Sequence, residues 1–366
     1  MSLRDVRILD LTRLLPGAHC TMLLARMGAE VIKVEDPAGG DYMRWMPPLE
    51  EGQSVLFHAL NAGKQSITLN LKAAAGRETF LQLVRGVDVV VEGNRPGVMQ
   101  RLGLGWDALR DARPALVMCS ITGYGQTGPY AGRAGHDLNY MAVAGALALN
   151  GAAGGPPLPL GVQVADIGGG GLAAAVAILG ALVDVARGGT GCHLDISMTD
   201  EVIDWIRMPL ALHAAEGELP ERGRQRLTGR YPCYRVYACA GGGYYSVGAL
   251  EPKFWVNLCT ALERPDLVAE QFAEGEAGRR THAEMETIFA TRSRDGWTQV
   301  LDGLEVCCEP VLELDEVAAH PQLRHRGVVP QLRGRAPALG ADTDAVLSEA
   351  GITAGRIGEL RSAGVI

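Results

Sequence analysis

Residues 7–35, RILDLTRLLPGAHCTMLLARMGAEVIKVE, decide the fold class of this chain. RILDLT (7–12) and EVIKVE (30–35) are rich in β-branched and aliphatic residues, which favour strands. Between them, Pro16-Gly17 introduces a helix over about residues 18–28. Strand, helix and strand in succession form a βαβ unit, whose two strands lie parallel in one sheet. The stretch therefore predicts an α/β fold.

The same alternation of strands and helices continues beyond this unit. DVVV, within the fourth predicted strand, is apolar throughout, as a strand buried on both faces of a parallel sheet should be. Further strands are predicted at SITLNL (66–71), DVVVEG (88–93), ALVMCSITGYG (115–125), VQVAD (162–166) and HLDISM (193–198). Helices are predicted over about 73–85, from the glycine run 168–171 to about 187, and from Thr199 to about Glu216.

The composition changes after residue 216, where a second domain is expected. Residues 217–230 are polar and rich in arginine, as linkers often are. YPCYRVYACAGGGYYSVGAL (231–250) has two aromatic-rich strands around a glycine turn, which predicts a β-hairpin. Helices are predicted from there to about residue 305, followed near the end of the chain by a helical tail over 343–363.

The overall composition is that of a globular protein with an acidic balance. A net charge of −8 and a pI of about 5.6 argue against nucleic acid as a partner. No apolar run approaches the roughly 20 residues that cross a bilayer, and MSLRDVRILDLT at the start lacks the features of a signal peptide. The eight cysteines form no CxxC or Cys/His zinc pattern. We therefore expect reduced thiols, no metal and no membrane, in a cytoplasmic protein.

The stretch VADIGGGGLAAA places Asp166 at the end of a predicted strand, just before four glycines and a helix. The unpaired N–H groups and the dipole of a helix start should keep this carboxylate ionised. The glycines would let a ligand approach the backbone closely. Asp166 is thus a candidate base or nucleophile. The alternative is a plain helix cap with glycines for packing, and the match of Gly168, Gly170 and Ala173 to a dinucleotide fingerprint is weak.

A second candidate, His136, lies between Gly135 and Asp137 at the start of a predicted helix. Histidine is the side chain best suited to proton transfer near neutral pH, and a helix N-terminus favours its neutral form. The alternative is a structural or surface histidine.

Basic residues and one acid complete the candidates. Lys64, Lys72, Arg95 and Arg101 could together hold a 3′-phosphate and a pyrophosphate in the crevice where open α/β sheets bind ligands. Separately, each would be an ordinary solvated charge. Glu251 follows an apolar strand and precedes a predicted helix, where an acid is also favoured by the dipole alone.

Taken together, these stretches resemble the class III coenzyme A transferases of the CaiB/BaiF type, a family that includes the α-methylacyl-CoA racemases. The resemblance covers nearly the whole chain and keeps the motifs in one order. They are RLLPGAHCTMLLARMGAEVIKVEDPAGGD, NAGKQSITLNLK, VVVEGNRPGVMQRLGLG, SITGYGQTGPYAGRAGHDLNY, VADIGGGG and GALEPKFW, with ALGADTDAVLSEAG in the tail.

The resemblance implies an architecture as well as a ligand. A Rossmann-like large domain with a parallel sheet would comprise residues 1–198 and 336–366. A linker helix (199–225), a small α+β domain (226–314) and a second linker (315–335) would lie between these parts. Two such ring-like subunits would interlock as a homodimer. The ligand would be an acyl-CoA, with coenzyme A as part of the substrate and no prosthetic group.

The resemblance also implies roles for individual positions. The thioester would lie at Asp166, and the catalytic positions would be Asp166, His136, Asp137 and Glu251. The positions implied to contact coenzyme A are Lys64, Leu71, Lys72, Arg95, Met99, Arg101, Gly135 and Tyr140. The backbone amide of Asp137 is our candidate donor to an enolate oxygen.

Two reactions compete within this family. In racemases, the equivalents of Asp166 and His136 flank the α-carbon and exchange its proton through an enolate, and the equivalent of Glu251 pairs with the histidine. In transferases, the aspartate attacks the thioester and carries coenzyme A as an aspartyl-CoA. The presence of the GHD motif and of Glu251, with Leu15 in place of a glutamine of the transferases, favours epimerisation of 2-methylacyl-CoA thioesters. Val162, in place of an asparagine of the racemases, argues the other way.

CoA transfer between carboxylic acids therefore stays open as an alternative. So does a non-catalytic CoA- or nucleotide-binding protein, which would keep the basic residues but would give no reason for His136 and Asp166 to converge.

Overall fold

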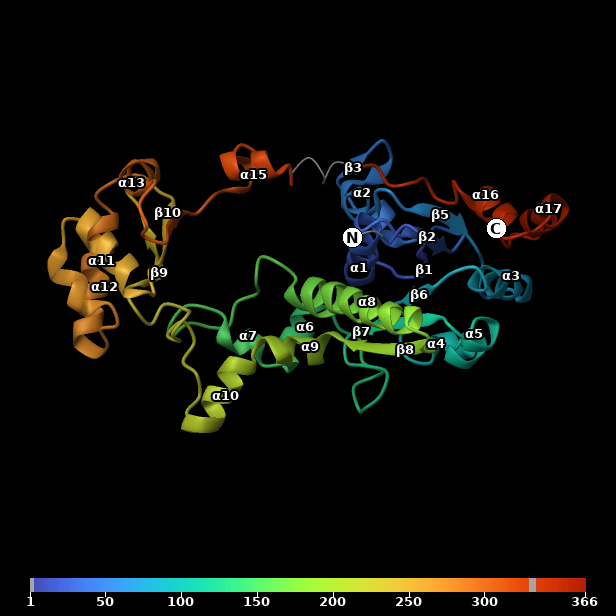
Figure 1. Cartoon of the computed structure of the whole chain (residues 1–366), viewed down its shortest axis with the longest axis horizontal. Coiled ribbons are helices and arrows are strands. Elements are labelled where there is room, and N and C mark those ends of the chain that lie inside the picture. The colour runs from blue at the N-terminus through green and yellow to red at the C-terminus, as the bar shows by residue number, and fades with distance from the viewer. Residues whose placement is uncertain (1–2, 329–333) are drawn as a thin grey trace. The chain divides into compact units, whose positions relative to one another are not determined.

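The computed structural model describes residues 3–328 and 334–366, which form two compact units (Figure 1). The first unit comprises the described residues of Met1–Ala146, Leu160–Met208 and Pro330–Ile366. The second comprises those of Leu147–Pro159 and Pro209–Val329.

A six-stranded parallel sheet organises the first unit, which confirms the α/β prediction. Its strands follow the order β5-β2-β1-β6-β7-β8, and every neighbouring pair is parallel. The strands are β1 (Arg7–Asp10), β2 (Glu30–Glu35), β5 (Gln65–Thr68), β6 (Val89–Glu92), β7 (Val117–Thr122) and β8 (Cys192–Ser197). A separate short hairpin pairs β3 (Leu49–Glu50) with β4 (Gln53–Ser54).

Several predicted strands end earlier than expected at their carboxyl side. RILDLT was predicted to residue 12, but β1 ends at Asp10 because the Thr12 N–H donates to Asp10 Oδ1 (2.9 Å) and turns the chain. The predicted strand VQVAD (162–166) is wrong. Residues from Val164 onward are helical, because the Asp137 carboxylate caps the N–H groups of Ala165 and Asp166.

Helices connect these strands and cover both faces of the sheet. They are α1 (Leu15–Arg26), α2 (Val55–Asn61), α3 (Ala74–Val84), α4 (Val98–Arg101), α5 (Trp106–Ala112), α6 (Asp137–Val143), α8 (Ala173–Ala186), α9 (Met198–Trp205), α16 (Thr343–Glu349) and α17 (Ala354–Ser362), with the 3-10 turn η1 (Tyr42–Trp45) and the π-helical segment η2 (Ala165–Leu172). The helix predicted over 199–216 is broken at Ile206 into α9 and α10 (Arg207–Glu216).

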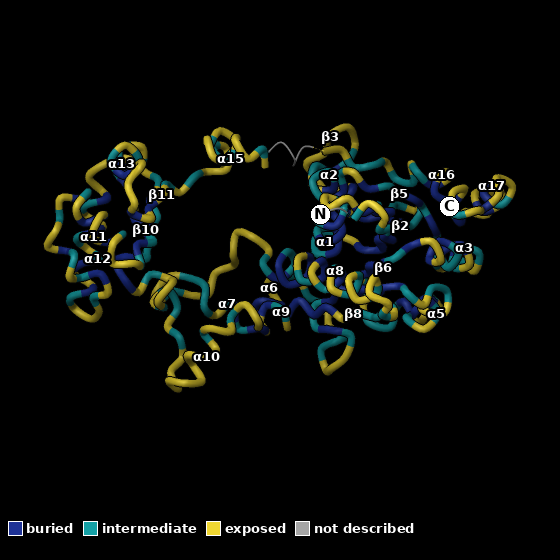
Figure 2. The backbone as a smooth tube through the Cα atoms, in the orientation of Figure 1, coloured by how far each residue is buried: buried dark blue, intermediate teal, exposed yellow. Residues whose placement is uncertain are grey.

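The main hydrophobic core lies on the face of the sheet covered by α3, α5, α16 and α17. Leu9, Ile32, Val90 and Met118 of the strands pack there against apolar residues of these helices. The strands are the buried centre of the unit in Figure 2. Because α16 and α17 come from residues 343–362, the first unit combines segments from the beginning and the end of the sequence.

The second unit is built on an antiparallel sheet in the order β11-β10-β9. Strands β9 (Tyr234–Ala238) and β10 (Tyr244–Gly248) confirm the hairpin predicted in 231–250. The third strand, β11 (Cys308–Pro310), was not predicted because three residues carry no readable alternation. An aromatic core of Tyr237, Tyr245, Trp255, Phe289 and Trp297 packs against these strands.

The helices of this unit are short to medium in length. They are α10, α11 (Pro252–Ala261), η3 (Pro265–Glu270), α12 (Gly275–Phe289), α13 (Arg294–Leu301), α14 (Leu314–Val317) and α15 (Pro321–Arg326), while α7 (Ala146–Leu149) lies where the chain passes between the units. The predicted small domain (226–314) falls inside this unit. The unit also holds residues 147–159, which contact it through the Arg222 Nε–H donating to the Ala148 carbonyl (2.8 Å). Residues 329–333 of the expected second linker lie outside the described residues.

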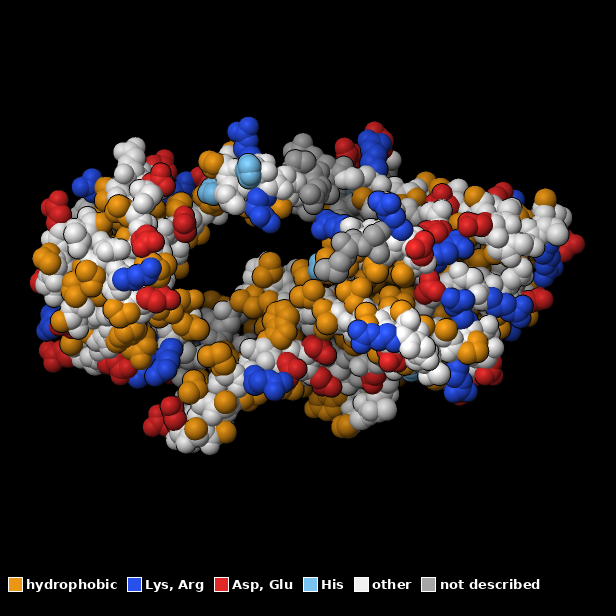
Figure 3. Space-filling model, in the orientation of Figure 1, with side chains coloured by type: hydrophobic (Ala, Val, Ile, Leu, Met, Phe, Trp, Pro, Cys, Tyr) orange, Lys and Arg blue, Asp and Glu red, His pale blue; other side chains and the backbone are white. Residues whose placement is uncertain are grey.

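One continuous helical run, Ala165–Ala186, is long and apolar enough to cross a membrane by length and composition alone. In the first unit this run, made of η2 and α8, packs against α1, β7 and β8, as core helices of globular proteins do. Leu172 of η2 and Val176 and Val183 of α8 are exposed. Hydrophobic side chains gather over α8 in Figure 3. On the same face, basic and acidic side chains are interspersed rather than separated by sign.

Candidate functional site

Asp166 lies in the first turn of a π-helical segment and not at the end of a strand as predicted. Segment η2 runs from Ala165 to Leu172 and continues directly into α8. A π-helical turn is wider than an α-helical one and is found frequently at functional sites.

The four glycines of η2 serve helix packing, which corrects the expectation that they open the backbone to a ligand. All four are buried. A Cβ added at Gly168 would lie 1.8 Å from the Trp205 ring of α9, and one at Gly171 would lie 2.6 Å from His19 Nδ1 of α1. No side chain fits at such distances, so glycine is required for η2 to contact α1 and α9 as closely as it does.

Asp137 fixes the start of η2 through its carboxylate. Its Oδ1 accepts hydrogen bonds from the N–H groups of Ala165 (2.7 Å) and Asp166 (3.1 Å). These two N–H groups have no partner within the helix, so the carboxylate acts as the cap of the segment. Sequence reasoning gave Asp137 a role only through its amide. It missed the cap because the partners are 28 and 29 residues apart and no local spacing signals the contact.

The environment of Asp166 makes ionisation harder than it is for a solvated aspartate. Burial and the nearby Asp137 carboxylate raise its pKa from 3.8 to about 6, while His136 acts in the opposite direction. A carboxyl group with a pKa near 6 can both accept and donate a proton near neutral pH.

His136 is held at the N-cap of α6, within electrostatic reach of Asp166. Its backbone N–H donates to Asn139 Oδ1 (3.0 Å), and its carbonyl accepts from the Asn139 N–H (2.8 Å). The first turn of α6 therefore carries the histidine, while Asp137 of the same turn caps the segment that carries Asp166.

Tyr140 lies beneath the GHD motif. Its hydroxyl donates to the Gly135 carbonyl, and its ring is buried against Tyr124 in an edge-on contact (5.2 Å between centroids). A Cβ at Gly135 would lie 2.7 Å from the Tyr140 ring, so Gly135 makes room for it. Burial and the charge of Asp166 raise the pKa of Tyr140 to about 12. The structure thus gives Gly135 and Tyr140 a supporting place beside the candidate acid and base.

A cleft of about 180 Å³ opens at the carboxyl ends of β1, β2, β5 and β6, where open α/β sheets bind ligands. Leu71 and Lys72, both predicted, line it, and Lys72 is exposed. Arg13 also lines the cleft and is exposed, although sequence reasoning did not single it out. Its place directly after β1 is the signal that could have identified it.

The loop and short helix after β6 carry three more predicted positions. Arg95 and Arg101 are exposed there, with the Arg101 guanidinium close to Gly97. Met99 is instead buried in the hydrophobic core, 3.6 Å from the amide nitrogen of Asn94, which lines the cleft. Met99 therefore supports this wall of the cleft from behind.

Lys64 does not face the cleft. Its Nζ is buried and lies within hydrogen-bonding distance of Thr21 Oγ1 (2.7 Å), Asn61 Oδ1 (2.8 Å), Asp10 Oδ2 (3.1 Å) and the Ala18 carbonyl (3.2 Å). Burial lowers its pKa to about 8 despite the attraction of Asp10. Because an ammonium group has only three donors, these contacts leave none for a phosphate. The structure removes Lys64 from the predicted phosphate-binding set and gives it an internal role.

Glu251 lies in the second unit as the exposed N-cap residue of α11. Its carbonyl accepts from the Phe254 N–H (3.0 Å), and its charge contributes to the raised pKa of Cys307. Its pairing with His136 stays a prediction.

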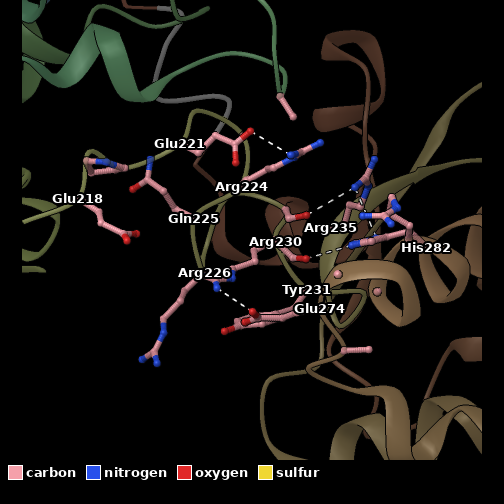
Figure 4. A pocket seen from close by; sticks show the side chains of 18 of the residues that line it. Glu218, Glu221, Arg224, Gln225, Arg226, Arg230, Tyr231, Arg235, Glu274 and His282 are labelled. Atoms are coloured by element: carbon pink, nitrogen blue, oxygen red, sulfur yellow. Dashed lines mark hydrogen bonds and ion pairs between the residues drawn. The ribbon is translucent and has the colours of Figure 1, made fainter. Parts of the chain in front are cut away.

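The second unit also holds a cavity of about 840 Å³, shown in Figure 4, that contains none of the predicted site residues. Three of the five arginines in its lining pair with glutamates of the same lining: Arg224 with Glu221 (3.0 Å), Arg230 with Glu274 (2.8 Å) and Arg235 with Glu286 (3.4 Å). Volume alone does not make this cavity the reaction site: Arg230 lowers the pKa of Glu274, which keeps this lining carboxylate ionised, and no carboxyl group with a raised pKa is among the described residues that line the cavity. Within the described ranges, no group of three His, Cys, Asp or Glu residues is placed to hold a metal ion.

Comparisons with known proteins cover the whole chain. A family model described as CoA-transferase family III matches residues 3–351. The α-methylacyl-CoA racemase of Homo sapiens is 31% identical, over 100% of this chain and 98% of the racemase. The succinyl-CoA:mesaconate CoA-transferase of Haloarcula marismortui is 34% identical, over 97% of this chain and 98% of that protein. The crystal structure of a CaiB/BaiF family protein from Brucella suis superposes with a TM-score of 0.82 at 31% identity, over 95% of this chain and 99% of that one.

Proposed function

The chain belongs to CoA-transferase family III, whose members are enzymes, and on this premise we propose that it epimerises the α-carbon of 2-methylacyl-CoA thioesters. The observation that carries the proposal is that the turn which bears His136 also holds the segment which bears Asp166: Asp137 Oδ1 accepts from the N–H groups of Ala165 (2.7 Å) and Asp166 (3.1 Å). Racemisation needs two groups that exchange a proton, and Asp166, whose pKa is raised to about 6, is suited to be one of them.

In the proposed reaction, one of these two groups removes the proton from the α-carbon. The electron pair of the broken C–H bond moves into the thioester carbonyl, which forms an enolate. The other group then returns a proton to the opposite face, and the two groups exchange roles for the opposite epimer. The Asp137 N–H is at the first position of α6 and lacks a partner within that helix, so it is our candidate donor to the enolate oxygen.

We propose that the nucleotide part of coenzyme A binds in the cleft at the carboxyl ends of the strands. Leu71 and Lys72 line this cleft, and Arg13 adds a second cation to its wall. Arg95 and Arg101 are exposed on the adjoining segment and are proposed to contact phosphates.

Transfer of CoA between carboxylic acids is the alternative, supported by relatives of that name at comparable identity. In that reaction, ionised Asp166 attacks the thioester carbonyl to form an anhydride and release the CoA thiolate. The thiolate then attacks the aspartyl carbonyl of the anhydride, which expels the first acid as a carboxylate and leaves CoA on Asp166 as a thioester. The acceptor carboxylate attacks this thioester to form a second anhydride and release the CoA thiolate, which then attacks the acyl carbonyl and frees Asp166 as a carboxylate. The third reading, a non-catalytic binding protein, is set aside because the relatives over the whole chain are enzymes.

A homodimer is also proposed. Exposed apolar residues along η2 and α8, namely Leu172, Val176 and Val183, support it, because large exposed apolar patches often mark protein–protein contacts. Light scattering of the purified protein measures the oligomeric state directly.

The reaction is tested by incubating the enzyme with one epimer of a 2-methylacyl-CoA in heavy water, without an acceptor acid. We expect deuterium at the α-carbon and appearance of the other epimer, followed by mass spectrometry and chiral chromatography. If neither occurs while CoA moves to an added carboxylic acid, the transferase reaction is established instead. Hydroxylamine should then trap Asp166 after incubation with acyl-CoA.

A further inference from the structure

One peptide group in the site has both of its polar atoms bonded by side chains of a single helical turn. It joins Gly135 to His136. Its N–H, on His136, donates to Asn139 Oδ1 (3.0 Å), and its carbonyl, on Gly135, accepts from the Tyr140 hydroxyl. Asn139 and Tyr140 are consecutive residues of α6.

The surroundings prevent this peptide group from rotating. The Tyr140 ring fills the space beside two glycines, since a Cβ would lie 2.2 Å from the ring at Gly123 and 2.7 Å at Gly135. Behind it, Tyr124 contacts both Tyr140 and Tyr130 edge-on, with centroids 5.2 and 5.5 Å apart. The Arg133 guanidinium covers the Tyr130 ring at 3.5 Å from its centroid. Packing against its neighbours therefore holds the Tyr140 ring in place independently of the hydrogen bond from its hydroxyl to the Gly135 carbonyl.

His136 precedes the first helical residue of α6, so helical hydrogen bonding does not set its backbone angles, which are extended (φ −131°, ψ 176°). Rotation of the Gly135–His136 peptide would swing the imidazole relative to Asp166, which a separate contact to Asp137 holds in place. The geometry of the two acid–base groups therefore depends on the orientation of this one peptide.

We infer that Asn139 and Tyr140 are positioning residues that clamp the Gly135–His136 peptide and so aim the His136 imidazole at the reacting carbon. This inference rests on the proposed function, because it assigns the clamp to the histidine side of proton transfer. Misplacement of a reacting group by about 1 Å can cost roughly 100-fold in rate, which sets the scale of the expected effect.

The test compares Asn139→Ala and Tyr140→Phe with two matched controls. Asn139→Gln keeps a neutral acceptor of the kind found at this position in helix capping boxes. Tyr130→Phe removes a hydroxyl in the same aromatic stack, two rings away from the clamp. We expect kcat for interconversion of the two epimers, which needs both groups, to fall about 10- to 100-fold in Asn139→Ala and Tyr140→Phe, with KM unchanged and both controls near wild type.

Two further readouts separate the clamp from other causes. If Asn139→Ala lowered the rate by changing the pKa of Asp166, the acid limb of its pH–rate profile would shift. If it only misplaces His136, as the clamp predicts, that limb stays at the wild-type pH. The ring signal of His136 in histidine-labelled protein, assigned with His136→Gln, should change in the two clamp variants and stay unchanged in the two controls.

Clamp variants with wild-type kcat and an unchanged His136 signal would overturn the inference, as would equal losses in the controls. If the wild-type enzyme shows no exchange at all, the proposed function fails by that result alone. The clamp is then decided by the His136 ring signal: a change confined to the two clamp variants supports it, and no change overturns it.

Discussion

Burial and the neighbouring Asp137 carboxylate disfavour ionisation of Asp166, although the proposed chemistry uses its ionised form. Burial and the Asp137 carboxylate raise its pKa to about 6. The folded chain therefore holds the proton more tightly than the unfolded chain, in which the pKa is near 3.8. Stability contributed by this group is greatest below pH 4 and declines as the pH rises through 6. The residue is thus expected to lower stability at neutral pH in exchange for reactivity.

Asp166→Asn should therefore stabilise the protein as it abolishes activity. A shift of this size corresponds to at most about 3 kcal/mol, and partial solvent exposure reduces it to about 1–3 kcal/mol. We expect this gain in unfolding free energy at pH 8 and little gain at pH 4, measured by denaturant unfolding. Asp111→Asn, at an exposed carboxylate of α5, is the control. An equal gain in the control, or a loss at pH 8, would contradict this account of Asp166.

Substitution of the two lysines in the predicted phosphate-binding set should have different effects: Lys64→Ala should lower the stability of the fold, and Lys72→Ala should weaken coenzyme A binding. Lys64→Ala leaves Asp10 buried without its partner, which costs about 3–5 kcal/mol of stability. Lys72→Ala removes an exposed cation from the cleft and should leave stability within about 0.5 kcal/mol.

In calorimetric titrations, Lys72→Ala should weaken coenzyme A binding and make it less sensitive to salt. A stable Lys64→Ala variant with weakened CoA binding would instead restore Lys64 to the phosphate site.

At the scale of elements, segment η2 connects the site to the packing of the first unit. Strand and helix positions in the first half of the chain could be predicted, because β-branched runs and helical periodicity are local signals. The strand predicted at VQVAD was wrong because the N–H groups of Ala165 and Asp166 donate to the Asp137 carboxylate, which caps a helical segment there. Local patterns do not encode this contact, because the partners are 28 and 29 residues apart. Likewise, the glycine run could be seen in the sequence, but its contacts with α1 and α9 depend on tertiary packing.

Two glycine substitutions on this one continuous helical run test that packing. Gly168→Ala forces a Cβ to within 1.8 Å of Trp205 and should destabilise the protein by about 1–3 kcal/mol or more. Gly180→Ala, on α8, meets nothing within 4 Å and should stabilise it by about 0.5–1 kcal/mol. Thermal unfolding of both variants gives the comparison. If Gly168→Ala is tolerated as well as Gly180→Ala, the close packing of η2 is not what the run of glycines provides.

At the scale of the whole molecule, the sequence predicted an α/β unit closed by both chain ends and a second unit with a hairpin. It also predicted that His136 and Asp166 converge on one carbon, which stays a prediction; both residues lie in the first unit, on α6 and η2. It did not predict that Lys64 is internal or that Asp137 caps η2, because both follow from contacts between residues far apart in sequence. The acid–base roles of His136 and Asp166 were predicted through the family resemblance, whereas the contacts that hold them could not be predicted from local patterns.

The central claim is that Asp166 and His136 serve opposite faces of one carbon. Exchange of the α-proton with heavy water, measured separately for each epimer with His136→Ala and Asp166→Ala, tests it most directly. Each variant should lose interconversion of the epimers. Each should also keep exchange of only the one epimer whose proton faces the remaining group, and the two variants should keep opposite epimers. Loss of exchange for both epimers in Asp166→Ala, together with full interconversion in His136→Ala, would contradict the account.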